Sequence, residues 1–178
     1  PGLRDLQGHE YLESILKSCN SIRSMKGHSK PILLKLSPDT NDDDIRDTVS
    51  FSQQMGIDGI VATNTTIKRP IPLSTQSRKA FSSDGGLSGQ PLNSRALEVI
   101  NMVYEETDGK LPIVGVGGID SKDSAWEAIV SGASLIQLYS ALVFNGPTVV
   151  SSIVKGLKKR VRESGFSSIS EAVGYKHI

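Results

Sequence analysis

Apolar residues recur with the period of an amphipathic helix in five stretches of the chain. Residues at this spacing share one face of a helix, so each stretch can bury a stripe against a core. The five are one whose face carries Leu12, Ile15, Leu16, Cys19 and Ile22; one that begins after Thr40 and ends at Gly56, with Ile45, Val49 and Met55 inward; one from Asn93 to Tyr104, with Leu97, Ile100 and Val103 inward; one that Asp120 is placed to cap and that ends near Gly132; and one with Pro147 in its first turn and Val150, Ile153, Val154, Leu157 and Val161 on one face.

Four short apolar runs lie between the predicted helices, and each has the length of a β-strand. Turn residues bound them, and they lack the polar alternation of a strand with one wet face. This pattern is typical of strands that are buried on both faces in a parallel sheet. The runs are Ile32–Leu36, Gly59–Ala62, Ile113–Val116 and Leu135–Leu138.

The order of the elements is one helix followed by four strand–helix units, which predicts an α/β fold with right-handed crossovers. Four such units are half of a (β/α)8 TIM barrel, here its C-terminal half with the last four strands. Half a barrel has two open sheet edges and one uncovered core face. An open, doubly wound sheet is the alternative. The long connection from Thr66 to Pro91 is of a length that is usually functional or mobile.

Composition and charge exclude several classes of protein. The 178 residues are 37% hydrophobic and 22% charged, which is ordinary for one globular domain and not for a disordered or fibrous chain. The net charge of +1 gives no sign of a nucleic-acid partner. A single cysteine, Cys19, cannot form an internal disulfide, and no apolar run spans a bilayer. The chain opens at Pro1, so we expect a processed chain or a piece of a larger one.

The candidate chemistry follows the last two predicted strands. Gly117 and Gly118 end the third strand, and Tyr139 and Ser140 end the fourth. Adjacent glycines let a backbone approach a ligand closely, and free amides at a turn and helix start attract phosphate. In TIM barrels the common phosphate site lies on the loops after the last two strands. We therefore predict a phosphate site here; two tight strand-to-helix turns are the alternative.

Polar residues in the other half of the chain suggest a second part of the site. Thr63, Asn64 and Thr65 end the second strand, where the amide of Asn64 suits a planar substrate with amide or carboxylate groups. A polar strand end is the alternative. Lys35 lies among leucines in the first strand, where a buried ammonium needs an anionic partner, such as a cofactor ring or a substrate. The alternatives are an ammonium that snorkels to water from the strand end and one paired with a structural carboxylate.

Other motifs are absent or weak. The glycine-rich segment 84–91 matches neither the GxGxxG nor the P-loop spacing, so it predicts no nicotinamide or ATP site. The three histidines are scattered, which predicts no metal site. Cys19 is expected in the core, and nothing in the chain provides a convincing general base.

Taken together, the motifs resemble those of the dihydroorotate dehydrogenases. The Thr-Asn-Thr-Thr and Gly-Leu-Ser-Gly-Gln-Pro-Leu forms resemble class 2, the membrane-associated, quinone-dependent type. The resemblance covers nearly the whole chain and makes residues 1–178 the C-terminal half of one FMN-binding (β/α)8 domain. The motifs are Pro1–Gln7, Lys35, Thr63–Thr66, Gly86–Gly89, Gly115–Gly118 and Gln137–Ser140.

The resemblance implies oxidation of dihydroorotate to orotate in pyrimidine biosynthesis, with FMN as cofactor and ubiquinone as electron acceptor. It also implies the mitochondrial inner membrane in eukaryotes or the cytoplasmic membrane in bacteria. Lys35 would lie beside the flavin and stabilise its reduced, anionic form, and Tyr139 would face the quinone. The cofactor-binding residues implied are Lys35, Thr63, Ser88, Gly89, Gly117, Gly118, Tyr139 and Ser140, and the substrate-binding residues are Asn64 and Thr65.

One departure from the family pattern concerns catalysis. The family's catalytic serine lies in an Asn-x-Ser-Ser-Pro-Asn-Thr segment just before Pro-Gly-Leu-Arg, and this chain begins at that Pro1. We expect no catalytic residue within the chain, membrane contact only through a region outside it, and no activity from the chain alone. The alternatives are another FMN-dependent barrel enzyme, such as a dihydrouridine synthase-like reductase, and a non-catalytic half-barrel that binds FMN or phosphate.

Overall fold

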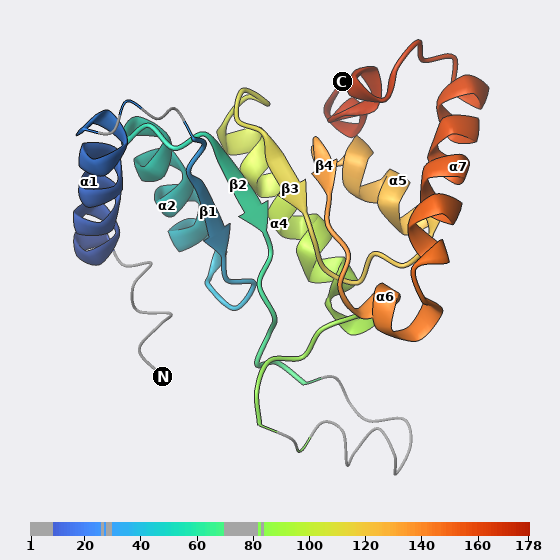
Figure 1. Cartoon of the computed structure of the whole chain (residues 1–178), viewed down its shortest axis with the longest axis horizontal. Helices are drawn as coiled ribbons and strands as arrows, with labels where there is room; N and C mark the ends of the chain where they lie inside the picture. The colour runs from blue at the N-terminus through green and yellow to red at the C-terminus, as the bar shows by residue number, and fades with distance from the viewer. Residues whose placement is uncertain (1–8, 26, 28–29, 70–81, 83) are drawn as a thin grey trace.

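The computed structural model describes residues 9–25, 27, 30–69, 82 and 84–178. The predicted Pro1–Gln7 motif and much of the connection between Thr66 and Pro91 lie outside these residues. The described chain folds into one sheet with helices packed against it (Figure 1). Its elements are α1 (His9–Met25), β1 (Leu33–Leu36), α2 (Asp42–Gln54), β2 (Gly59–Ala62), η2 (Gln90–Leu92), α4 (Asn93–Glu106), β3 (Ile113–Gly115), α5 (Lys122–Val130), β4 (Leu135–Ile136), α6 (Ser140–Asn145), α7 (Thr148–Glu163), η3 (Ile169–Ala172) and η4 (Tyr175–His177).

The four predicted strands form one parallel sheet in the order β1-β2-β3-β4, so sequential strands are neighbours. The register places Leu36 opposite Ala62, Ala62 opposite Gly115, and Gly115 opposite Ile136. Each strand is followed by a helix, which confirms the α/β class and its repeated strand–helix units. Sequential parallel order is the arrangement of a barrel wall and differs from a doubly wound sheet, in which the order reverses.

In the described part of the chain, helices cover only one face of this sheet. On that face Leu36, Ile60 and Ile113 are buried, and α2, α4 and α5 lie behind the strands (Figure 1). The residues that alternate with them face the other way, and there Leu33 is 41% and Leu135 61% exposed. The prediction that every strand is buried on both faces is therefore wrong for this chain, because no described helix packs on the second face. The prediction of an uncovered core face is confirmed.

The core between sheet and helices is continuous, and its centre is fully buried. Val49 of α2 and Val99 and Val103 of α4 have no exposed surface, and Ile60 and Ile113 of the sheet face them. The predicted stripes supply Val49 and Val103; Val99 was not predicted, and Leu97, which was, is only partly buried. On α1 the prediction is only partly right, since Leu12 and Leu16 are buried whereas Ile15 and Ile22 lie on the outer side.

Helix boundaries agree with the predicted ones to within a few residues, but the capping residues differ. Asn41 caps α2, and its Oδ1 accepts a hydrogen bond from the amide of Asp44. Ser121, and not Asp120, caps α5: its Oγ accepts the amide of Ser124, whose own Oγ accepts the amide of Ser121. This reciprocal pair satisfies two first-turn donors together, which a lone aspartate cannot do. Pro147 lies one residue before α7.

The last residues of the chain form a clamp that the helical periodicity does not predict. The Gly174 amide donates to the carbonyl of Ile129 (3.1 Å), and the His177 ring stacks on Tyr104 at 4.7 Å. Lys176 pairs with Glu127 of α5. This C-terminal clamp therefore ties α4 to α5 at the end of the molecule away from the carboxyl ends of the strands (Figure 1).

Asp58 joins α1 to the amino end of the sheet, and its effect on stability should depend on pH. Its Oδ2 accepts the amide of Ile32 and a hydrogen bond from Arg23, both at 2.7 Å. The hydrogen bond from the Ile32 amide is the largest cause that lowers the pKa of the Asp58 carboxyl; burial opposes it, and the hydrogen bond and charge of Arg23 lower the pKa further. A lowered pKa in the folded state means that the ionised group adds stability above the unfolded-state pKa of about 3.9.

Asp58→Asn should therefore lower the free energy of unfolding by about 0.5–1 kcal/mol at pH 7, a modest amount because the pair is exposed. The difference from the wild type should close as the pH falls below about 4 towards the folded-state pKa. Urea denaturation of both proteins between pH 3 and 7 measures this. A difference that stays constant over that range would contradict the assignment.

Candidate functional site

The hydrogen-bond ladder of the sheet continues past the strands at their carboxyl ends. The amide of Asn64 donates to Leu36 O (2.8 Å), that of Thr63 to Val116 O (2.7 Å), and that of Gln137 to Gly115 O (2.9 Å). These bonds hold the first residues of the strand-to-helix loops at one level. Side chains that lie far apart in the sequence are thereby brought to a common edge, where α/β barrels place their ligands.

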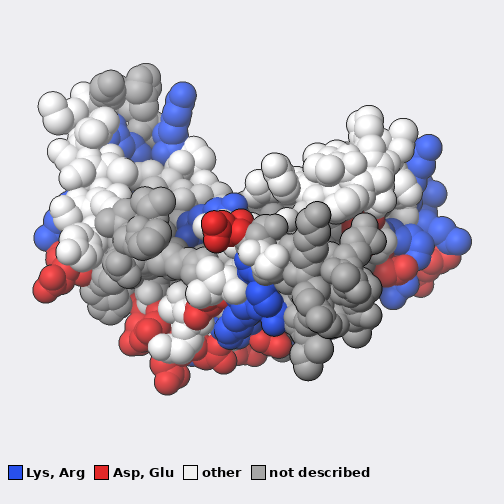
Figure 2. Space-filling model, turned by 90° about the horizontal axis from the view of Figure 1, so that it is seen from below, with Lys and Arg blue, Asp and Glu red and all other residues white. Residues whose placement is uncertain are grey.

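A cavity of about 590 Å³ lies at this edge, and its size is typical of a small-molecule or cofactor site. Seen from the carboxyl ends of the strands, the molecule is hollowed between two raised margins with mostly uncharged side chains (Figure 2). All ten candidate residues of the sequence analysis line this one cavity. They are Lys35, Thr63, Asn64, Thr65, Ser88, Gly89, Gly117, Gly118, Tyr139 and Ser140.

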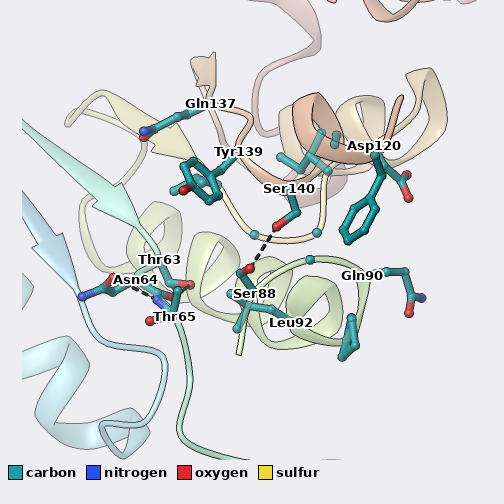
Figure 3. A pocket seen from close by; sticks show the side chains of 18 of the residues that line it. Thr63, Asn64, Thr65, Ser88, Gln90, Leu92, Asp120, Gln137, Tyr139 and Ser140 are labelled. Carbon is teal, nitrogen blue, oxygen red and sulfur yellow. Dashed lines mark hydrogen bonds between the residues drawn. The ribbon is translucent and has the colours of Figure 1, made fainter. Parts of the chain in front are cut away.

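The wall that follows β2 is held by its own side chains (Figure 3). Thr63 is buried and its hydroxyl donates to the carbonyl of Asn64 at 2.9 Å. The Oδ1 of Asn64 accepts the amide of Thr65, also at 2.9 Å. This bond uses the acceptor of the Asn64 side chain and sets its orientation, so the Nδ2 group is the part that can donate to a ligand.

The glycines after β3 are required by close packing on the start of α4. Gly117 has φ +140°, and a Cβ there would lie 2.7 Å from Cβ of Ala96. A Cβ on Gly118 would lie 2.7 Å from Cβ of Asn93, whose Nδ2 donates to Gly117 O at 3.2 Å. Within the described residues no acceptor is found for the amides of Gly118 and Ile119. Two neighbouring free donors that line a cavity suit an anion such as phosphate.

The start of α5 itself contributes less to anion binding than the sequence predicts. The serine pair that caps the helix already satisfies the amides of Asp120, Ser121 and Ser124. The free donors therefore belong to the loop before the helix. The Asp120 carboxylate also lines the cavity and is a feature that the sequence analysis missed as part of the site.

Two hydroxyl groups join walls that are 52 positions apart in the chain. The Oγ atoms of Ser88 and Ser140 lie 2.9 Å from each other (Figure 3). Next to them Gly89 has φ +83°, and a Cβ there would lie 3.6 Å from the Ser140 side chain. The two loops thus meet at Ser140, and Tyr139, 73% exposed, stands beside this junction at the edge of the cavity.

Lys35 reaches the cavity from β1, but it is not buried as the sequence predicts. Its register partner is Val61, and both lie on the uncovered face of the sheet. Lys35 is exposed there because no described helix packs on that face. The desolvation argument for an obligatory partner is therefore wrong in this chain, while the placement of Lys35 in the cavity wall is a separate observation that stands.

Several lining residues were not predicted. Gln137 lies two positions before Tyr139, so strand alternation could have placed it on the same face. Phe144 and Asn145 belong to α6, a six-residue helix too short to give a clear periodic signal. The other residues of this kind are Gln90, Pro91, Leu92, Val116, Ile119, Asp120 and Ala141.

The ionisable side chains of the cavity wall are Lys35, Asp120 and Tyr139. No group of three or more His, Cys, Asp or Glu residues in the described part of the chain is arranged to hold a metal ion. Among the described helices none has both the length and the apolar character that crossing a membrane requires. The lining thus combines amide, hydroxyl and ammonium donors with apolar surface, which suits an anionic, partly aromatic ligand.

The parallel sheet, the uncovered face and the cavity at the strand ends define the class: half of a (β/α)8 barrel with a ligand site on its strand-to-helix loops. The family model for dihydroorotate dehydrogenase matches residues 1–161. The chain belongs to the dihydroorotate dehydrogenase family, as its motifs predict.

Relatives with known names agree with this assignment. The chain is 43% identical over 182 residues to the dihydroorotate dehydrogenase (quinone) of Rippkaea orientalis, covering 99% of the chain and 47% of that protein. It is 42% identical to the mitochondrial dihydroorotate dehydrogenase (quinone) of Mus musculus, over 99% of the chain and 44% of the relative. The chain therefore spans about half the length of these relatives.

Solved structures show the same fold. The dihydroorotate dehydrogenase of Eimeria tenella in complex with ferulenol superposes with a TM-score of 0.90 at 28% identity. The match covers 99% of this chain and 50% of that one. The half-barrel prediction is thus confirmed.

Proposed function

We propose that this chain supplies the flavin-binding half of a quinone-linked dihydroorotate dehydrogenase, with residues 1–178 forming part of a single barrel domain. The observation that carries the proposal is the meeting of ten candidate residues, from five separate segments of the chain, in one cavity. The family match and the names of the relatives support it. In this role the protein would act in the redox step of pyrimidine synthesis.

The cavity residues fit FMN. Free loop amides suit its phosphate, the apolar lining suits its ring system, and a volume of about 590 Å³ lies in the usual range for such sites. When bound, FMN would accept a hydride from dihydroorotate and pass the electrons to ubiquinone. In this proposal Gly117, Gly118, Tyr139 and Ser140 hold the phosphate, while Ser88 and Gly89 lie along the cofactor.

The remaining residues would orient the reacting groups. Thr63 contacts the flavin, and the Lys35 ammonium places a positive charge where negative charge develops during reduction. Asn64 and Thr65 hold the substrate, with the Nδ2 of Asn64 as the donor that its bond to Thr65 leaves available. Tyr139 and Phe144, which is 84% exposed, form an apolar margin on the side where a quinone would approach.

The catalytic base in this proposal comes from outside the chain, as the family pattern implies. Among the described residues that line the cavity there is no histidine or cysteine, and Asp120 stands beside the proposed phosphate loop. We therefore propose that the chain alone does not turn over dihydroorotate. Association with the mitochondrial inner membrane, or with a bacterial cytoplasmic membrane, would likewise come through a region outside it, and no nucleic acid takes part.

Reassembly of a whole barrel tests the function. The chain is produced together with the part of the Rippkaea orientalis relative that it does not match, and we call this complex the completed barrel. We expect the completed barrel to bind FMN and to oxidise dihydroorotate with a soluble quinone, and the chain alone to show no turnover. The relative's own two halves, separated at the same point and reassembled, provide the control for assembly.

Three outcomes would contradict the proposal. Flavin binding without oxidation, when the control pair is active, would favour a non-catalytic FMN-binding half-barrel. Reduction of a different substrate in place of dihydroorotate would favour another FMN-dependent barrel enzyme. Turnover by the chain alone would show that the base lies within it.

A further inference from the structure

The β1–α2 loop carries an aspartate that does not line the cavity but binds a wall of it. Asp39 lies four residues after Lys35. One carboxylate oxygen accepts a hydrogen bond from the hydroxyl of Thr66, and the other accepts the amide of Ile67 at 2.9 Å. Thr66 is 7% exposed and follows Thr65 of the cavity wall, so its bond to Asp39 is partly buried, whereas the bond from the Ile67 amide is exposed.

Thr66 in turn joins two walls of the cavity. It pairs with Leu87 in an antiparallel bridge, with its amide donating to Leu87 O (3.1 Å) and the Leu87 amide donating to Thr66 O (2.7 Å). Thr65 precedes Thr66 and Ser88 follows Leu87, and both line the cavity. The position of Thr66 therefore sets the distance between the wall that follows β2 and the wall that leads into α4.

The loop that carries Asp39 is itself fixed from the other side. Arg95 of α4 donates from Nε to Pro38 O (3.0 Å) and from Nη2 to Thr40 O (3.1 Å). These carbonyls flank Asp39 in the sequence, and Asp42 binds the same guanidinium at 2.8 Å. The Asp39 carboxylate is thus presented from a loop with an anchored backbone, so its bonds to Thr66 and Ile67 can position those residues.

We propose that Asp39 is a positioning residue for the substrate wall of the cavity, holding Asn64 and Thr65 at a fixed distance from Ser88. The proposal rests on the proposed function, because the wall that Asp39 holds in place is the one proposed to bind dihydroorotate, a ring with amide and carboxylate groups. Asp39 is not among the described residues that line the cavity, and in this proposal it takes no part in proton or hydride transfer. Its effect should therefore appear in binding more than in the chemical step.

The chemistry of the contact favours a carboxylate over its neutral analogue. The Thr66 hydroxyl and the Ile67 amide both donate to Asp39, and the Thr66 hydroxyl already accepts the amide of Lys68 at 3.0 Å. An asparagine would present one amino group where a carboxylate oxygen now accepts, so one of these two bonds would be weakened or lost. Thr66→Val removes the same bond from the other side while keeping the side-chain shape.

Asp58 provides a matched control at the opposite end of the sheet. It also accepts one backbone amide, that of Ile32, and one side-chain donor, Arg23. In the completed barrel, Asp39→Asn and Thr66→Val should each raise the KM for dihydroorotate and the dissociation constant for orotate about tenfold, with kcat changed less than about threefold. Asp58→Asn should leave all three within about twofold. Equal effects of Asp39→Asn and Asp58→Asn on affinity would reduce Asp39 to a structural role and overturn the proposal.

A second measurement needs neither flavin nor activity and separates this proposal from the function on which it rests. In the chain alone, without the rest of the barrel, amide hydrogen exchange at Ile67 and Leu87 should be about tenfold faster in Asp39→Asn than in the wild type. It should be unchanged in Asp58→Asn. Unchanged exchange at both amides would contradict the positioning role even if the completed barrel is active. The opposite result is also informative. If exchange is faster in Asp39→Asn but the completed barrel is inactive while the control pair is active, the positioning role stands and the proposed function is refuted.

Discussion

Gly117→Ala should lower the free energy of unfolding by about 2–4 kcal/mol and abolish binding of FMN to the completed barrel. Its φ of +140° lies in a region that only glycine adopts readily, which alone costs about 1–3 kcal/mol for another residue. The added Cβ would lie 2.7 Å from Cβ of Ala96, an atom that cannot move without its helix, and overpacking of this kind adds about 1–3 kcal/mol. Urea denaturation and flavin fluorescence measure the two effects.

Gly146→Ala is the control for the backbone strain alone. Gly146 has φ +71°, and a Cβ there meets no atom within 4 Å. This variant should lose only about 1–2 kcal/mol and should keep flavin binding, because its position is outside the cavity wall. If Gly117→Ala binds flavin as tightly as Gly146→Ala, the loop after β3 does not hold the phosphate.

Lys35→Met should lower the rate of flavin reduction by dihydroorotate in the completed barrel by a factor of about 10²–10³. Removing one preorganised charge or donor from the place where charge develops costs this much in other enzymes. Because Lys35 is exposed and its methylene chain is retained in Met, the stability of the protein should change by less than about 0.5 kcal/mol. Stopped-flow absorbance of the flavin under anaerobic conditions measures the rate.

Lys110→Met is the matched control for loss of a positive charge. Lys110 is exposed and pairs with Asp108 in the loop before β3, at the amino ends of the strands. We expect its flavin reduction rate to stay within about twofold of the wild type. A rate for Lys35→Met within threefold of this control would remove Lys35 from the proposed chemistry and leave it as a lysine of the cavity margin.

The fold could be predicted from periodicity because apolar residues recur at a regular spacing along each of the longer helices. Val49 in α2 and Ile100 and Val103 in α4 lie where helical spacing places the core, and each is buried. The order of strands and helices was enough to give a parallel sheet with sequential neighbours. Periodicity failed for α6, because a helix of six residues is too short to show a repeat. It also failed to identify the cap of α5, because that cap is a reciprocal pair of hydrogen bonds between Ser121 and Ser124.

Burial could not be predicted in the same way, because it depends on what covers a face. The apolar runs suggest strands enclosed on both sides, yet Leu33 and Leu135 are largely exposed on the uncovered face of the sheet. The error about Lys35 has the same origin. A local pattern shows that a residue suits a buried environment and does not show whether the described chain provides it.

The candidate site could be predicted at the level of its lining residues and not of its supports. Motifs and resemblance give positions such as Asn64 and Ser140, and the cavity contains them. The contact between Asp39 and Thr66 joins positions 27 residues apart in two irregular loops, where no periodic rule applies. Such supports become visible only in three dimensions.

The C-terminal clamp has a practical consequence for attaching the protein to a solid surface. Ile178 is 95% exposed and follows His177, which stacks on Tyr104, at the end of the molecule away from the carboxyl ends of the strands (Figure 1). A short flexible tether joined there would leave the cavity turned towards the solution. Immobilisation through the carboxyl terminus on a sensor chip or an electrode should therefore keep the cavity open to ligands, whereas random coupling through lysines would also modify Lys35 and obstruct it.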